Sequence, residues 1–279
     1  VNLFILISGY FGIRHIVKPL LKLFIDLTVY GLIAYSVGVI FFGIDFSLGG
    51  LVHGIDVHNW FVVHFALLIL SAPILEASME GKNPECLIRW IVLLLIINVV
   101  FGYVLGYVNI NGYNYLNFIM LYVIARYIRL IKENNSPLYA HFKRFGVCYW
   151  IISAMMLTLG FVILWKVGHV PNSVRYFGYN NPIILLSSFC LFVVFSSLKF
   201  QSRKINLIAT GMFGVFLMHT PPEIIPIRNA ISSHMFQSNG YFGIFTEIIC
   251  LFIILSLIAV PIEQINKRIL QVIYGFIKK

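Results

Sequence analysis

Long apolar runs joined by short polar turns dominate this sequence and limit the folds open to it. Most of the runs approach the roughly 20 residues that an α-helix needs to cross a membrane. They lack the strict alternation of apolar and polar residues that is typical of a membrane β-barrel strand. Only 11% of the 279 residues are charged, whereas soluble domains contain about 25%. The sequence therefore predicts an all-α fold, a polytopic bundle of transmembrane helices.

About nine membrane spans can be delimited in the sequence. In chain order they are 1–13, 23–42, 60–75, 90–108, a fifth that contains 118–124, then 146–165, 182–198, 205–219 and 241–261. The loop between the last two, 220–240, is predicted to be the longest external loop. The tail, 264–279, is predicted to be an amphipathic helix on the inner membrane surface. No linker, internal repeat or low-complexity segment interrupts the chain, so we expect a single domain over residues 1–279.

Positive charge is concentrated in alternate turns, which predicts the orientation of the chain. The turns after the first, fifth, seventh and ninth runs carry Lys and Arg, and the loops between them carry few. The turn at 76–89 has mixed charge and indicates little about the orientation of the chain. Because Lys and Arg are retained on the cytoplasmic side of a membrane, we expect a multi-pass protein with a cytoplasmic C-terminus.

The turn between the fifth and sixth runs is strongly basic. It sets five cations against one acid, Glu133; the cations are Arg126, Arg129, Lys132, Lys143 and Arg144. They can act only as anchors that fix the orientation of the chain. They can also form a basic rim that binds an anionic, phosphate-bearing ligand. The sequence leaves both interpretations open.

Acidic residues inside the apolar runs need a partner, because an isolated charge at membrane depth is costly. Asp26 lies about one helical turn after Lys22, and we expect it to pair with Lys22 or Lys18. Glu247 lies about two turns inside the last run. The candidate partners of Glu247 are Arg228, Arg175 or a histidine.

Other polar residues in the runs have both a structural and a functional interpretation. His64 is expected to be hydrogen-bonded or to reach the interface, with catalysis as the alternative. His219 closes its run before two prolines, where irregular backbone can line a cavity. Ser8, Gly9 and Tyr10 place small and polar groups together, and close helix packing is the expected reason.

Several functional classes are excluded. The net charge of +10 does not indicate nucleic-acid binding, because the basic residues lie between spans and form no soluble basic domain. The four cysteines are far apart and have neither metal-ligand spacing nor a disulfide pattern. No nucleophile elbow, phosphate-binding loop, zinc-protease motif or dinucleotide fingerprint occurs. We expect no bound metal and no bound cofactor.

Four stretches together resemble the acyltransferase-3 family of integral-membrane acyltransferases. They are ISGYFGI at 7–13 with the turn that follows, NWFVVHFALLILSAPIL at 59–75, NFIMLYVIARYIRL at 117–130, and residues 179–222. Arg129 matches an arginine that ends an aromatic-rich span, and His219 matches a histidine that ends a late span. His64 and Phe216 depart from the family pattern, which more often has small or tyrosyl residues at the first position and Tyr at the second. The nearest branch is that of bacterial enzymes of surface-polysaccharide clusters.

The resemblance implies ten spans, the first of which carries an Arg or Lys and, about ten residues later, a histidine that acts as base. This chain begins at Val1 inside an apolar run and shows nine, so we expect that span to precede it. Without that span, a catalytically inactive remnant is one alternative. A polytopic glycan transporter or flippase component is another.

The activity implied is transfer of an acyl group, usually acetyl, from cytoplasmic acyl-CoA to a sugar hydroxyl. The acceptor is a glycan or lipid-linked precursor of capsule, exopolysaccharide or lipopolysaccharide, and the protein lies in the bilayer of the bacterial inner membrane. Acyl-CoA is a co-substrate. The predicted CoA-binding residues are Arg129, Arg126, Arg14, Lys143 and Arg144. His219 is the candidate catalytic residue, and the candidate cavity residues are Ser8, Tyr10, Trp60, His64 and Tyr115.

Overall fold

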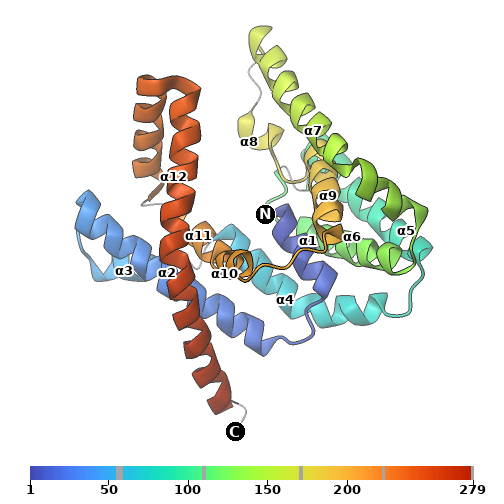
Figure 1. Cartoon of the computed structure of the whole chain (residues 1–279), viewed down its shortest axis with the longest axis horizontal. Coiled ribbons are helices and arrows are strands. Elements are labelled where there is room, and N and C mark those ends of the chain that lie inside the picture. Colours follow the sequence, from blue (N-terminus) through green and yellow to red (C-terminus); the bar gives the residue numbers. More distant parts are fainter. Residues whose placement is uncertain (55–58, 109–110, 170–171, 222–223, 278–279) are drawn as a thin grey trace. The chain divides into compact units, whose positions relative to one another are not determined.

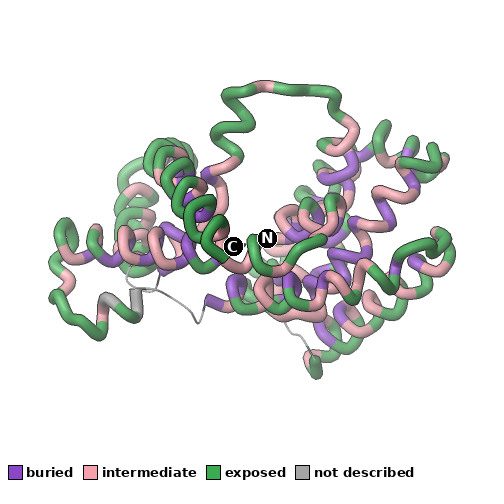
Figure 2. Tube along the Cα trace, turned by 90° about the horizontal axis from the view of Figure 1, so that it is seen from below, coloured by how far each residue is buried: buried purple, intermediate pink, exposed green. Residues whose placement is uncertain are grey.

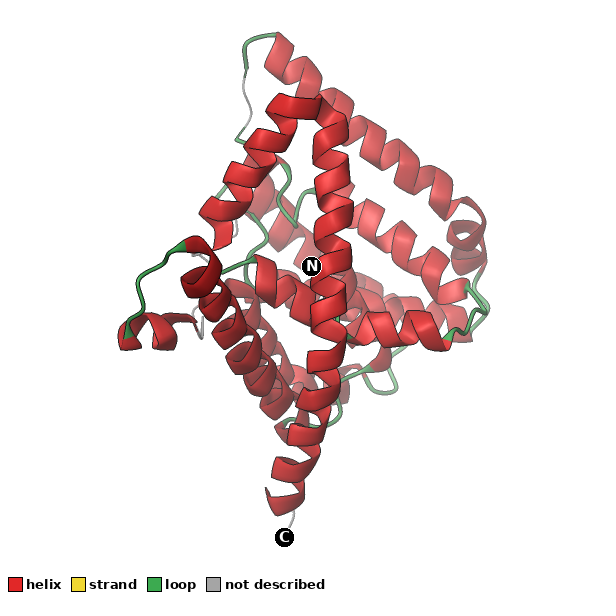
Figure 3. Cartoon of the chain, turned by 60° about the vertical axis from the view of Figure 1, so that its left-hand side comes forward, coloured by secondary structure: helices red, strands yellow, loops and turns green. Residues whose placement is uncertain are grey.

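The computed structural model describes residues 1–54, 59–108, 111–169, 172–221 and 224–277, and this part of the chain is helical without strands (Figure 3). Five of its helices are long and apolar enough to cross a membrane, and two shorter apolar helices accompany them. The all-α prediction is confirmed for these residues. The predicted number of nine spans is not confirmed.

The chain divides into two compact units, each built from two separate stretches. Unit 1 comprises Val1–Ile16 and Trp60–Lys199, and unit 2 comprises Val17–Asn59 and Phe200–Lys279. In both, buried and exposed residues alternate along the helices (Figure 2). The single domain expected over residues 1–279 stays a prediction.

Unit 1 is a helical bundle around one central helix, α6. Its elements are α1 (Asn2–Phe11), α4 (Trp60–Met79), α5 (Pro84–Leu95) with the π-helix η1 (Ile96–Val104), α6 (Tyr115–Glu133), α7 (Pro137–Lys166), α8 (Ser173–Tyr176) and α9 (Pro182–Ser197). Helix α6 packs against α1, α4, α5 and α7, while α7 and α9 lie side by side (Figure 1). More than half of α6 is buried, including Phe118, Tyr122 and Ile128.

Local sequence signals set the ends of these helices. Asn114 begins α6, because its side chain accepts a hydrogen bond from the Asn117 backbone N–H. Ser136 caps α7 in the same way, with Pro137 in the first helical position. Gly9 allows α1 and α6 to approach closely: a Cβ atom there would lie 2.7 Å from the Tyr122 carbonyl oxygen. The packing interpretation of this glycine is therefore confirmed.

Unit 2 is built on two long helices joined by a buried ion cluster. Its elements are α2 (Val17–Phe42), α3 (Leu48–Gly54), α10 (Arg203–Thr210), α11 (Met212–His219) and α12 (Ile224–Ile277). The Lys22 Nζ lies 2.6 Å from Asp26 Oδ2 and 2.8 Å from Glu263 Oε1. Asn266 Nδ2 donates to Asp26 Oδ1 at 3.0 Å. The expected pairing of Asp26 with Lys22 is confirmed, and Glu263 is a second partner.

The structure corrects the predicted 220–240 loop. Most of that segment is helix, which turns at Gly240 (φ 57°) and continues to Ile277 as one element, α12. The two arms on either side of Gly240 pack antiparallel (Figures 1 and 3), and Ser232 Oγ donates to Glu247 Oε1 at 2.7 Å. Glu247 is therefore held by a hydroxyl, and in the described part of the chain it forms no ion pair with an arginine or histidine.

Two further boundaries differ from the prediction. The span predicted at 205–219 is divided into α10 and α11 at Gly211. The tail predicted as a separate amphipathic helix continues α12 as far as Ile277, and its residues Asn266 and Leu270 are buried. Its helical conformation is confirmed, and its place on the membrane surface stays a prediction.

Candidate functional site

One end of unit 1 gathers basic side chains, and we call it the basic end. It is formed by the C-terminal ends of α1, α4, α6 and α9 and by the start of α7. A hydrogen-bonded chain joins three of these helices: the Ile13 N–H donates to Tyr122 Oη at 2.9 Å, and Tyr122 Oη donates to Glu76 Oε1 at 2.6 Å. Arg126 Nη2 completes the chain at 3.1 Å from Glu76 Oε2.

Arg129 and Lys132 lie at the same end, one helical turn apart. Arg129 pairs through Nε with Glu133 Oε1 at 2.8 Å, and its Nη1 donates to the Tyr10 carbonyl at 3.4 Å. Lys132 Nζ donates to the Ser196 carbonyl and lies 5.5 Å from the centre of the Tyr10 ring. The structure thus brings Tyr10 together with Arg129 and Lys132 from a distant part of the sequence.

Glu76 was not predicted to belong to the site; it lies inside α4 rather than in a turn. The sequence did contain a signal for this pairing: Glu76 follows one apolar run directly, and Arg126 and Arg129 follow another. Its carboxylate neutralises Arg126, as Glu133 neutralises Arg129. In this contact group, three cations meet two carboxylates and one net positive charge remains.

Three other predicted CoA-binding residues, Arg14, Lys143 and Arg144, are exposed. Arg144 lies over the Phe145 ring at 5.2 Å. Among the described residues, none of the three forms a hydrogen bond or ion pair with the contact group around Arg129. The basic group that is held in place is therefore smaller than the sequence suggested, and the ligand roles of all these residues stay predictions.

The opposite end of unit 1 is rich in amide and aromatic groups, and we call it the amide end. Trp60 stacks on Tyr113 with ring centres 4.5 Å apart, and Tyr179 lies 5.0 Å from Tyr113. Asn2 Nδ2 donates to the Tyr179 carbonyl at 3.0 Å. Burial, with a smaller contribution from Tyr113, raises the pKa of Tyr179 to about 12. This phenol is therefore protonated at physiological pH.

Tyr113 and Tyr179, rather than Tyr115, stack on the Trp60 ring. Tyr115 is half-buried at the start of α6, and within the described ranges its ring does not stack on Trp60. His64 donates from Nδ1 to the Trp60 carbonyl. This bond confirms the hydrogen-bonded interpretation of His64.

Ser8 and His219 each hydrogen-bond to a carbonyl of their own helix. Ser8 Oγ donates to the Phe4 carbonyl at 3.1 Å. His219, at the end of α11 in unit 2, donates from Nδ1 to the Val215 carbonyl at 2.9 Å. This bond fixes the tautomer in which Nε2 carries the lone pair. A nitrogen with a lone pair can accept a proton, and the catalytic role of His219 stays a prediction.

The described residues contain no group of three or more potential metal ligands, and all four cysteines are free thiols. With its long apolar helices, the chain has the features of a polytopic membrane protein. The family model of the acyltransferase-3 acyltransferase domain matches residues 1–262, and the chain belongs to this family. Comparisons with curated proteins and with solved structures found no match.

Proposed function

We propose that the protein transfers an acetyl group from cytoplasmic acetyl-CoA to a sugar hydroxyl. The acceptor is a precursor of capsule, exopolysaccharide or lipopolysaccharide, and the protein acts in the bacterial inner membrane with its C-terminus in the cytoplasm. Membership of the acyltransferase family supports acyl transfer. The cation group around Arg129 is the observation that supports a CoA donor.

The basic end suits the phosphates of CoA for two reasons. Arg129 is fixed by Glu133 and Tyr10 but remains about one-third exposed, with a side-chain accessibility of 34%. Charge-assisted hydrogen bonds from a fixed guanidinium to a phosphate are short and strong. Lys132, held over the Tyr10 ring, adds a second cation one turn away. Arg126, paired with Glu76, holds α4 and α6 together beside them.

The transfer needs a base that removes the proton of the sugar hydroxyl as the oxygen attacks the thioester carbonyl. The carbon–sulfur bond then breaks, and CoA leaves as the thiol. His219 is our candidate base, because its Nε2 carries the lone pair. Hydrogen-bond donors near the thioester oxygen would stabilise the negative charge that develops there.

Arg129→Ala is expected to weaken acetyl-CoA binding by roughly 10- to 100-fold, the effect of one charge-assisted hydrogen bond. The measurement is acetyl transfer from labelled acetyl-CoA by the protein in membrane vesicles, with KM for the donor as the readout. Arg268→Ala is the matched control, because Arg268 is exposed in unit 2. An unchanged donor KM in Arg129→Ala would show that the phosphate role is wrong.

Mass spectrometry of the surface glycan separates acylation from transport. Cells that lack the gene should export the same polymer without its acetyl groups. Loss of the polymer itself would instead support the transporter alternative.

A further inference from the structure

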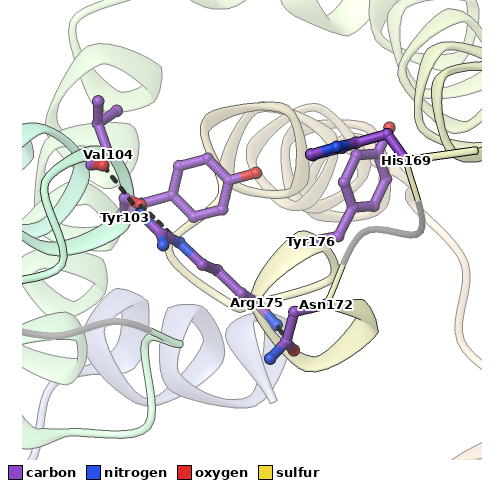
Figure 4. Close-up of a pocket in the computed structure, with 6 residues that line it drawn as sticks. All are labelled: Tyr103, Val104, His169, Asn172, Arg175 and Tyr176. Carbon is purple, nitrogen blue, oxygen red and sulfur yellow. Dashed lines mark hydrogen bonds between the residues drawn. The ribbon is translucent and has the colours of Figure 1, made fainter. Parts of the chain in front are cut away.

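A cavity at the amide end of unit 1 has the chemistry of an anion site. We propose that it binds an acidic group, a carboxylate or a phosphate, of the sugar acceptor; this inference rests on the proposed function. The cavity has a volume of about 400 Å³. Six residues line it (Figure 4): Tyr103, Val104, His169, Asn172, Arg175 and Tyr176.

Arg175 is held rigidly at the edge of this cavity by the end of η1. Its Nε and Nη2 donate to the Tyr103 carbonyl at 3.2 and 2.8 Å, and Nη2 also donates to the Val104 carbonyl at 2.9 Å (Figure 4). The last carbonyls of a helix have no partner within that helix, and here the guanidinium satisfies them. These bonds use one edge of the guanidinium and leave the two N–H groups of Nη1 for a ligand.

The charge of Arg175 is not neutralised by an acid of its own unit. Unit 1 contains four acidic residues, and all of them lie near the opposite, basic end: Glu76, Glu80, Glu85 and Glu133. Arg175 forms no ion pair within the described residues. A fixed guanidinium whose only partners are neutral carbonyls can accept an anion without displacing a carboxylate.

The other polar groups of the cavity are suited to a sugar. Asn181 Nδ2 donates to Tyr103 Oη at 3.0 Å, so the phenolic hydrogen of Tyr103 is directed away from that bond and can be donated to a ligand. Tyr176 uses its hydroxyl on the Leu157 carbonyl at 3.1 Å and presents its ring as a wall. The imidazole of His169 is exposed beside it. A cation, neutral donors and an aromatic face match an acidic sugar.

The test compares acidic and neutral acceptors with variants of the cavity. Acetyl transfer is measured in membrane vesicles with three acceptors: a uronic-acid oligosaccharide, its carboxyl-reduced neutral form, and a phosphorylated sugar. Arg175→Gln should raise the KM of an acidic acceptor about tenfold and leave the KM of the neutral acceptor and of acetyl-CoA unchanged. The response of the carboxylate and phosphate acceptors identifies the anion that the cavity takes.

Two further variants keep the test decisive. His169→Gln changes an exposed side chain that lines the cavity and supports no helix end, so this variant should fold even if Arg175→Gln does not. It should weaken the binding of acidic acceptors severalfold. Lys166 carries the same positive charge as Arg175 but does not line the cavity, so Lys166→Gln should leave the KM of every acceptor unchanged. Equal losses for acidic and neutral acceptors, or no preference in the wild type, would overturn the proposal.

Binding without catalysis separates this proposal from the proposed function. The protein in nanodiscs is titrated with the uronic-acid oligosaccharide and with its neutral form in the absence of acetyl-CoA. Charge-dependent binding that Arg175→Gln and His169→Gln weaken, without any acetyl transfer, would support the cavity and contradict the transferase. Acetyl transfer without charge-dependent binding would contradict the cavity alone.

Discussion

Lys22→Met is expected to destabilise unit 2 by about 3 kcal/mol, the lower end of the range for removing one partner from a buried ion pair, because the carboxylates are buried but the Lys22 side chain is 35% exposed. Its ammonium lies within 2.8 Å of both Asp26 and Glu263, whose side chains are only 2% and 3% exposed. Without the lysine, two buried carboxylates face each other with Asn266 as the remaining donor. Thermal unfolding of the protein in nanodiscs, followed by circular dichroism, measures the loss.

Two variants show whether the effect comes from the ion cluster. Lys18→Met is the control, because Lys18 is exposed and its ammonium lies 5.8 Å from the centre of the Tyr274 ring, with no ion pair among the described residues; the substitution should cost less than about 1 kcal/mol. Adding Asp26→Asn and Glu263→Gln to Lys22→Met should recover much of the stability, because no buried charge is then left unpaired. Equal unfolding temperatures for Lys22→Met and Lys18→Met would contradict the assignment.

Gly9→Val is expected to separate α1 from α6 at a cost of about 1–3 kcal/mol or more, the range for overpacking a tight contact. The new Cβ would lie 2.7 Å from the Tyr122 carbonyl oxygen and 2.9 Å from the Ala125 Cβ. The first of these is a backbone atom of the central helix and cannot turn aside. The bonds from Arg129 to the Tyr10 carbonyl and from Ile13 to Tyr122 should then be lost.

Two quantities are measured for Gly9→Val. Loss of the α1–α6 contact should lower the unfolding temperature and raise the KM for acetyl-CoA. Gly275→Val is the matched control. Gly275 also lies in a helix, but no atom stands within 4 Å of a Cβ there. A Gly9→Val protein as stable as Gly275→Val would show that the two helices can move apart freely.

The sequence predicted the helices well where an apolar run ended in an unambiguous signal. The run expected at 182–198 is α9, Pro182–Ser197, because Asn181 and Pro182 form a strong helix start. The same reasoning was wrong at 220–240. There, proline and polar residues indicated a loop, but Pro226 lies in the first turn of α12, where its missing N–H costs little. The reversal needs only Gly240, whose positive φ favours glycine.

For the candidate site, the family resemblance directed attention to Arg129, and the basic turn directed it to Arg126. Both lie at the basic end, where Arg129 bonds to the Tyr10 carbonyl and Arg126 pairs with Glu76. The partners of these arginines could not be predicted. Glu76 lies 50 residues from Arg126 in sequence, and no periodicity of α4 indicates which helix faces it. Contacts of this kind depend on packing, which apolar runs leave open because nearly every face of each helix is apolar.

Helix α6 also sets a length scale for the reaction. It carries Asn117 in its first turn and Arg129 12 residues later, near its C-terminal end, which places the two about 18 Å apart along a straight helix. If CoA binds at Arg129 and the acceptor at the amide end, as we propose, the nucleotide lies far from the acceptor. The flexible pantetheine arm of the donor would then have to carry the thioester across that gap. A shortened donor analogue should consequently occupy the protein as a competitive inhibitor while transferring nothing.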